Sequence, residues 1–81
     1  MENNSLSITQ VFAVTSIEVY ISAFSDNPEG YFKKITDLID EHKITEHKEM
    51  MTYLYELFVR KGTREYIEEF RKKYSIESEN N

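Results

Sequence analysis

An 81-residue chain can close only one hydrophobic core, so we expect a single domain over residues 1–81, with frayed ends at 1–4 and 76–81. The absence of cysteine excludes disulfides, thiolate nucleophiles and cysteine-ligated metal sites, and it favours a cytoplasmic protein. A net charge of −5 argues against a general nucleic-acid binder, which needs a basic surface to neutralise phosphates.

The first predicted element, residues 5–26, has Glu18 as its one charged side chain before Asp26 at its end. As a helix it would be apolar around most of its circumference, so it would have to be covered on nearly every side. Its Val, Ile and Thr content also suits a strand, and Thr15 to Glu18 fits a capping box that would start a helix after a short strand. We favour one long helix, with a break near Thr15 left open, because so long a run without a turn signal exceeds a normal strand.

A helix is predicted from residue 28 to about residue 42. Asn27 can cap it, and Pro28 suits its first position, where the missing amide hydrogen costs nothing. The apolar residues recur with the helical period and predict one buried face. This face comprises Tyr31, Phe32, Ile35, Leu38, Ile39 and His42.

Two further helices are predicted after a break at residues 43–45. Thr45 caps the first, which runs to Lys61 and stops at Gly62. Thr63 caps the last, which runs to about Tyr74. Their apolar faces comprise Met50, Met51, Leu54, Tyr55, Leu57 and Phe58 on the first, and Tyr66, Ile67, Phe70 and Tyr74 on the second.

These patterns predict an all-α bundle of three to four helices, with the N-terminal segment as its most buried element. The alternative is an α+β protein in which a short N-terminal strand or hairpin precedes the helices. That layout resembles ribbon-helix-helix repressors in outline only, because their DNA-reading strands carry alternating basic or amide side chains, and Leu6 to Val14 offers only Gln10.

His42 and His47 lie in two copies of the tripeptide Glu-His-Lys. Their spacing is not the four-residue spacing of paired metal ligands on one helix. If the helix breaks at Ile44 and Thr45, both histidines lie at the resulting joint. We expect them to pack this joint and predict no metal site, because two histidines without cysteine or a fixed carboxylate form an incomplete zinc set. A pH-sensitive or metal-binding joint is the alternative.

Sequence signatures of catalysis are absent, and we predict neither an enzyme nor a cofactor. Two glycines cannot form a glycine-rich phosphate loop, and no serine-centred nucleophile motif is present. The adjacent carboxylates Glu68 and Glu69 diverge on a helix, whereas acid–base catalysis needs them to converge on one substrate.

Four residues are candidates for contact with a partner. Tyr53 projects from the polar side of its helix beside Arg60, and exposed Tyr and Arg are typical anchors of protein interfaces. Arg64 and Arg71 are seven residues apart on one side of the last helix, within a local run of basic residues at 60–73. They could contact an acidic group or a phosphate.

We therefore expect a protein-binding regulator or inhibitor that acts by surface occlusion, with a protein partner or a homodimer formed through residues 6–25. In size and acidity the chain resembles the inhibitors that bacteriophages and mobile elements encode, including anti-CRISPR proteins and anti-sigma factors. That resemblance implies host-cell cytoplasm as the compartment and assigns no residue. The alternative is a dimeric DNA-binding transcriptional regulator that uses the 60–73 basic surface. No membrane insertion is expected, because the uncharged run is too short and too polar to span a bilayer.

Overall fold

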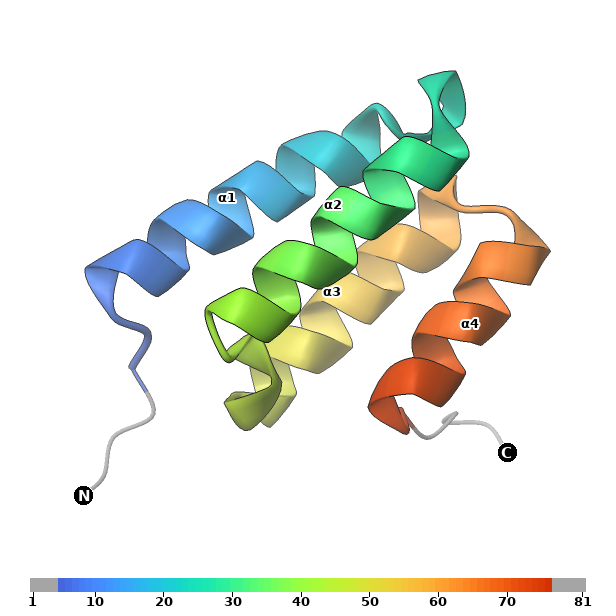
Figure 1. Ribbon diagram of the computed structural model, residues 1–81. Coiled ribbons are helices and arrows are strands. Elements are labelled where there is room, and N and C mark those ends of the chain that lie inside the picture. Colours follow the sequence, from blue (N-terminus) through green and yellow to red (C-terminus); the bar gives the residue numbers. More distant parts are fainter. Residues whose placement is uncertain (1–4, 77–81) are drawn as a thin grey trace.

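A computed structural model describes residues 5–76, and this part of the chain is all-α (Figure 1). Four α-helices are joined by short connections, two of which include a single turn of 3-10 helix. The predicted all-α bundle is confirmed, and the strand alternative is wrong, because residues 5–76 contain no strand. The expected frayed ends lie outside the described residues, except for Ile76, which is partly buried against the core. The α-helices are α1 (Ile8–Ser22), α2 (Pro28–Glu41), α3 (Lys48–Lys61) and α4 (Arg64–Tyr74), and the 3-10 turns are η1 (Phe24–Asp26) and η2 (Ile44–Glu46).

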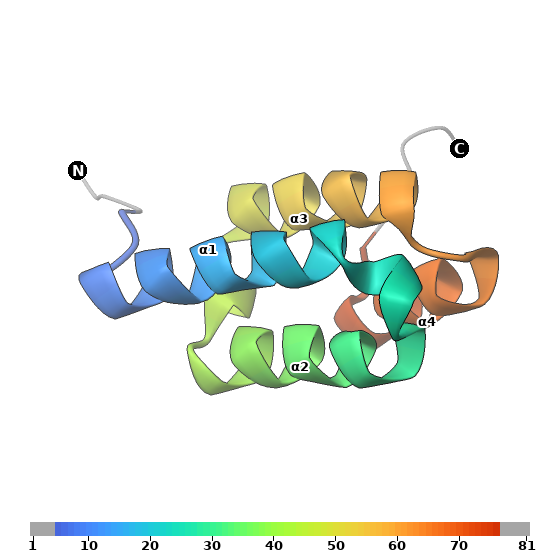
Figure 2. The same cartoon turned by 90° about the horizontal axis from the view of Figure 1, so that it is seen from above.

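Successive helices run in alternating directions (Figures 1 and 2). Seen from above, α1 runs between α2 and α3, which lie on its two sides (Figure 2). α1 packs mainly on α2 and also on α3, while α4 packs on α3. The side of α1 that faces away from α2 and α3 is consequently turned to solvent.

α1 is a single unbroken helix that begins at Ile8. Its capping box is formed by Ser7 and Gln10, whose side chains each accept a hydrogen bond from the other residue's backbone amide, at 3.1 Å and 2.9 Å. The suspected break near Thr15 and the capping box at Thr15 to Glu18 are therefore wrong. The Thr15 hydroxyl instead donates to the Val11 carbonyl at 3.0 Å, one turn back within the helix.

Among the helices of residues 5–76, α1 has the largest number of buried residues, but it is covered on one side only, whereas the sequence predicts cover on nearly every side. Its inner side buries Ala13, Val14, Ile17 and Ile21. Its outer side leaves Ile8, Phe12 and Val19 at 68%, 66% and 60% exposure. α2 and α3 both pack against the inner side of α1, so they leave its apolar outer side exposed.

The caps of the later helices follow the sequence signals in part. The Asn27 side chain accepts from the Gly30 amide at 3.3 Å at the start of α2, as predicted, and Pro28 occupies the first position. Gly62 ends α3, and Thr63 precedes α4 without a side-chain capping bond. The predicted cap at Thr45 is wrong, because Thr45 lies within the turn η2 and α3 starts three residues later, after His47.

The core lies where the predicted faces of α2, α3 and α4 meet the inner side of α1. The completely buried side chains are Ile17, Phe24, Ile35, Ile39, Ile44, Leu54, Phe58 and Phe70. Phe24, from the turn after α1, packs edge-on against Phe58 of α3, with ring centroids 4.9 Å apart, and against Tyr66 of α4, at 5.4 Å. Such edge-to-face pairs add to the free energy gained from burial alone.

A left-handed residue connects α2 to α3. Lys43 has φ 55° and ψ 38°, a conformation that an L-residue with a side chain adopts only at a cost. We expect Lys43→Gly to raise the free energy of unfolding by about 0.5–1 kcal/mol, because glycine adopts this conformation freely. Chemical denaturation would measure the change. Lys34→Gly, at an exposed position in the middle of α2, should instead lower stability by about 1 kcal/mol, and a loss at both positions would contradict the explanation.

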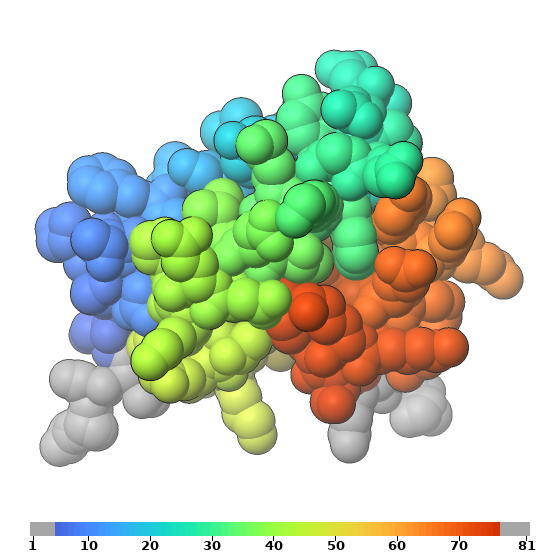
Figure 3. Space-filling model, viewed as in Figure 1, coloured from blue at the N-terminus to red at the C-terminus, as the bar shows by residue number. Residues whose placement is uncertain are grey.

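Side-chain hydrogen bonds connect helices that are distant in sequence. The Gln10 side chain donates to the His42 carbonyl at 2.8 Å and so links the start of α1 to the end of α2. The Tyr74 hydroxyl donates to Asp40 at 3.0 Å, and the Lys73 ammonium lies 3.3 Å from the same carboxylate. The end of α4 is thereby held against the C-terminal half of α2, where the two lie side by side in Figure 3.

Burial and the hydrogen bond to Asp40 together raise the pKa of Tyr74 above its ordinary value of 10.0. Folding thus favours the neutral phenol. Its contribution to stability is fully present below pH 10 and is lost as the pH rises further, because the unfolded chain releases the proton first. We expect the free energy of unfolding to fall above pH 10 and this fall to be shallower in Tyr74→Phe. Denaturation across this alkaline range checks it, and Tyr20→Phe is the control at a tyrosine whose hydroxyl forms no side-chain hydrogen bond within residues 5–76.

Candidate protein-binding surface

Two of the predicted partner-binding residues line one groove between α1 and α3. The groove has a volume of about 300 Å³, and Tyr53 and Arg60 of α3 lie on its wall opposite Glu18 and Ser22 of α1. Tyr53 and Arg60 are separated by seven residues, so they point from the same side of α3 two turns apart. We call this feature the α1–α3 groove; its lining comprises Glu18, Ile21, Ser22, Tyr53, Leu57, Arg60 and Lys61.

Tyr53 is fixed in the groove by a hydrogen bond across the two helices. Its hydroxyl donates to the carboxylate of Glu18, and this bond is the main cause of an upward shift in the pKa of Tyr53. The ring nevertheless remains 42% exposed. A half-exposed aromatic ring that is already held in position can contact a partner at little cost in conformational entropy.

The groove has an acidic residue, Glu18, at one part of its lining and two basic residues at another. Glu18 is half-buried and bonded to Tyr53, while Arg60 and Lys61 in the last turn of α3 are exposed. Neither basic residue forms an ion pair within residues 5–76. Ile21 and Leu57 form the floor between them, the former buried and the latter half-buried. The groove therefore combines an apolar floor and an aromatic ring with a basic end.

The other two candidates, Arg64 and Arg71, are not part of this groove. Both belong to α4, where Arg64 is exposed and Arg71 is half-buried. Arg71 lies 2.9 Å from Glu68, and this hydrogen-bonded pair lowers the pKa of the Glu68 carboxyl. Lys73 is likewise paired with Asp40. Two of the basic residues at 60–73 thus have acidic partners within the protein itself.

The two histidines lie on either side of the turn η2. His42 follows the last residue of α2 and His47 precedes the first residue of α3, and both are half-buried. Within residues 5–76 no hydrogen bond joins them, and no group of three His, Asp or Glu side chains is close enough to hold a metal ion. His42 contributes to the joint through its backbone carbonyl, which accepts from Gln10.

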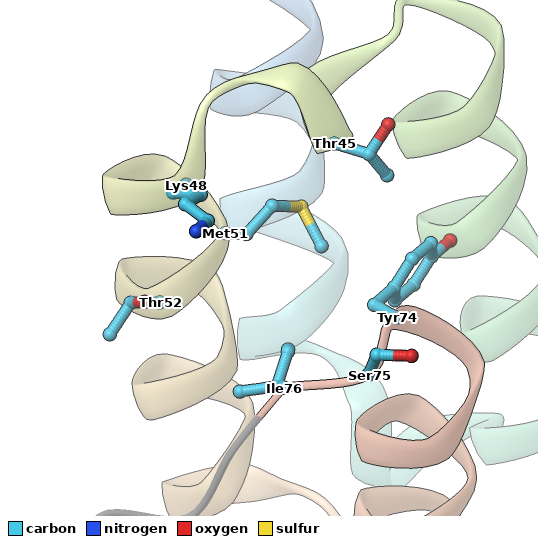
Figure 4. A pocket seen from close by; sticks show the side chains of 7 residues that line it. All are labelled: Thr45, Lys48, Met51, Thr52, Tyr74, Ser75 and Ile76. Carbon is cyan, nitrogen blue, oxygen red and sulfur yellow. The ribbon is translucent and has the colours of Figure 1, made fainter.

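Two further hollows lie near the joint. One, of about 460 Å³, is lined by His47 and Met50 together with Leu6. The other, of about 470 Å³, lies between the start of α3 and the end of α4, with Met51, Tyr74 and Ile76 in its lining (Figure 4). Figure 4 shows the Tyr74 hydroxyl pointing toward α2, in line with its bond to Asp40. Among residues 5–76, Lys48 is the one charged side chain that lines this second hollow.

Sequence reasoning missed Glu18 as a member of the groove and missed the exposed apolar residues of α1. A signal for Glu18 was present, because it is the one charge in residues 5–25 and so must reach solvent or a polar partner. For the exposed residues no signal separates the inner from the outer side of a helix that is apolar all round.

Comparison with protein-family models, with curated proteins and with solved structures finds no match to this chain. No helix in residues 5–76 has the length and apolar character that crossing a bilayer requires. Because no similar protein suggests a function, the function has to be inferred from the surface chemistry of the α1–α3 groove.

Proposed function

We propose that the protein is a small cytoplasmic regulator or inhibitor that binds another protein through the α1–α3 groove and occludes the surface it covers. The observation that carries the proposal is the pairing of an exposed, pre-positioned Tyr53 with an exposed Arg60 around an apolar floor. Tyr and Arg are the residues most enriched among those that dominate binding energy at protein interfaces.

The groove fits a protein side chain better than a metabolite. Its volume of about 300 Å³ is at the lower limit of small-molecule sites, and no convergent set of polar groups lies at its base. Arg60 and Lys61 at its end favour a partner that presents an apolar side chain next to an acidic one.

A DNA-binding regulator is the competing function. The basic residues at 60–73 would have to contact phosphates together, but Arg71 and Lys73 are already paired with Glu68 and Asp40. The remaining basic residues would act against a net charge of −5. This balance favours a protein partner.

The test is affinity capture from source-cell lysate with the tagged protein, with and without nuclease. We expect a stoichiometric, nuclease-resistant protein. With that protein purified, Tyr53→Ala and Arg60→Ala should each weaken binding by about 30-fold, as expected for dominant interface residues. Lys34→Ala, at an exposed position of α2, is the matched control and should bind as the wild type does.

Two results would contradict the proposal. The first is capture of nuclease-sensitive nucleic acid without a stoichiometric protein, which would favour the basic surface with Arg64 and Arg71. The second is a partner whose affinity is unchanged by both groove variants. Salt dependence gives an independent check, because phosphate contacts make affinity fall steeply with salt.

A further inference from the structure

The α1–α3 groove has a direction, because its charged residues are separated along it. Glu18 accepts from Tyr53 at one end, and Arg60 and Lys61 lie at the other. Seven residues separate Tyr53 from Arg60, which is about 10.5 Å along a helix. A segment that fills the groove therefore meets a carboxylate at one end and two basic side chains at the other.

Both helices that form the groove end near its basic residues. α1 and α3 run in the same direction, so their C-terminal ends lie at the same end of the groove (Figure 1). The C-terminal end of a helix carries a partial negative charge. α3 compensates this charge with Arg60 and Lys61, whereas α1 has no basic residue in its last turn. The N-terminal end of another helix, which is positive, is therefore favoured at this end of the groove.

Glu18 has one carboxylate oxygen that can accept from a partner. The Tyr53 hydroxyl donates to Oε2, and within residues 5–76 no ion pair or hydrogen bond involves the other oxygen. Because Glu18 is half-buried, a basic donor that reaches this oxygen forms a charge-assisted hydrogen bond in partly desolvated surroundings. Between the two charged ends, the floor of Ile21 and Leu57 accepts an apolar side chain.

We infer that the occupant of the α1–α3 groove is a helical segment of the partner that runs antiparallel to α3; this inference rests on the proposed function. The first turn of the segment presents Asp or Glu to Arg60 and Lys61. An apolar side chain three or four positions later covers the floor, and Lys or Arg seven positions after the acidic residue reaches Glu18. The antiparallel direction places the positive end of the segment beside the negative ends of α1 and α3.

The segment belongs to a different protein, because this chain does not supply it. None of the helices in residues 5–76 carries an acidic residue, an apolar residue three or four positions later and a basic residue seven positions later. The nearest approach is Glu41, Ile44 and Lys48, but these residues extend across the turn η2 and do not share a helix. A second copy of the chain thus has no helix that matches the groove.

Selection from a displayed library tests the chemistry of the occupant. The library presents one stable helix that is randomised at its first, fourth, fifth and eighth positions, and it is selected on the purified chain. We expect Asp or Glu at the first position and Lys or Arg at the eighth to be enriched about threefold or more over the unselected library. Apolar residues should be enriched at the fourth or fifth position.

A charge exchange tests the contact with Arg60. Replacing the acidic residue of a selected helix by Lys should weaken its binding to the wild-type chain about 30-fold, and Arg60→Glu should recover about tenfold of this loss. Lys34→Glu makes the same change in net charge at an exposed residue of α2 outside the groove lining. This control should recover nothing, and circular dichroism checks that both variants remain helical.

A spin label tests the direction of the segment, and the chain has no cysteine that would take up the label. A nitroxide at the N-terminus of a selected helix should broaden the amide signal of Lys61 in the NMR spectrum more than that of Glu18. A nitroxide at the C-terminus should do the reverse. The opposite result would show a parallel segment and would overturn the inference.

The other contrary results separate this inference from the proposed function. Selected helices that lose affinity for Tyr53→Ala but lack the charge pattern would overturn the inference and leave the groove as a binding site. A selection that yields no helix would exclude a helical occupant, while capture of the partner from lysate decides the proposed function independently. Helices whose affinity is unchanged by both Tyr53→Ala and Arg60→Glu would contradict the groove itself.

Discussion

Replacing Phe58 with alanine is expected to remove a large part of the free energy of unfolding of the protein. Phe58 is completely buried, and its ring packs against Phe24, Phe32 and Phe70 with centroid distances of 4.9, 5.9 and 5.3 Å. Removing a ring from such a site costs about 3–5 kcal/mol. The total free energy of unfolding of a domain this size is only about 4–12 kcal/mol, so the variant loses between about a quarter and all of its stability.

The adjacent residue provides the control for this prediction. Val59 is 44% exposed on the other side of α3, and Val59→Ala should change the free energy of unfolding by about 0.5 kcal/mol or less. Phe58→Leu keeps most of the buried volume and should lie between the two. Urea denaturation of all three variants measures these differences. Equal effects at residues 58 and 59 would contradict the orientation of α3.

Replacing Ile17 with aspartate is expected to unfold the protein. Ile17 is fully buried on the inner side of α1, beside Val14 and Ile21, and residues 5–76 place no basic side chain in this core. A carboxylate at this position would have to be buried without a partner or else protonated, which costs several kcal/mol in either case. Loss of the helical circular dichroism signal at neutral pH, with partial recovery at acidic pH, would show this.

Val19→Asp tests the opposite side of the same helix. Val19 is 60% exposed, so the same substitution should cost about 0.5 kcal/mol or less. Urea denaturation of the two variants at the same protein concentration measures this difference. Unfolding of both variants, or of neither, would show that α1 does not bury the side with Ile17 while exposing the side with Val19.

The helical character and buried faces of residues 28–74 could be predicted from the sequence because polar and apolar residues alternate there with the helical period. Ile35, Ile39, Leu54, Phe58 and Phe70 were all assigned to the core and are completely buried. On these helices the charged residues mark the solvent side, so the pattern itself orients each helix.

The orientation of α1 could not be predicted in the same way. Its polar residues are mostly Ser and Thr, which tolerate both partly buried and exposed positions, and its apolar residues surround the axis. Only the packing against α2 and α3 separates Ile17, which is buried, from Val19, which is exposed. A helix that is apolar all round is covered on every side only where other elements surround it. In residues 5–76, α2 and α3 cover the inner side of α1, and its outer side stays exposed.

The candidate surface was predictable in part. Tyr53 and Arg60 were identified because they lie beside each other on the polar side of one helix, and the structure places both in one groove. Glu18 was missed because its partner is 35 positions away, and no local pattern reports a contact at that distance. The left-handed Lys43 was missed for a different reason, since glycine or asparagine usually occupies such a position.

The separation in sequence between residues that contact each other affects how fast the chain folds. The side-chain hydrogen bonds that join different helices in residues 5–76 link positions 32 to 38 apart. Gln10 and His42, which form one of these bonds, are both translated before α3 and α4. Most contacts in an all-α protein nevertheless lie within its helices, and such proteins fold within microseconds to milliseconds. The first two helices can pair while the last two are still being translated, so the newly made protein needs little time before it can act.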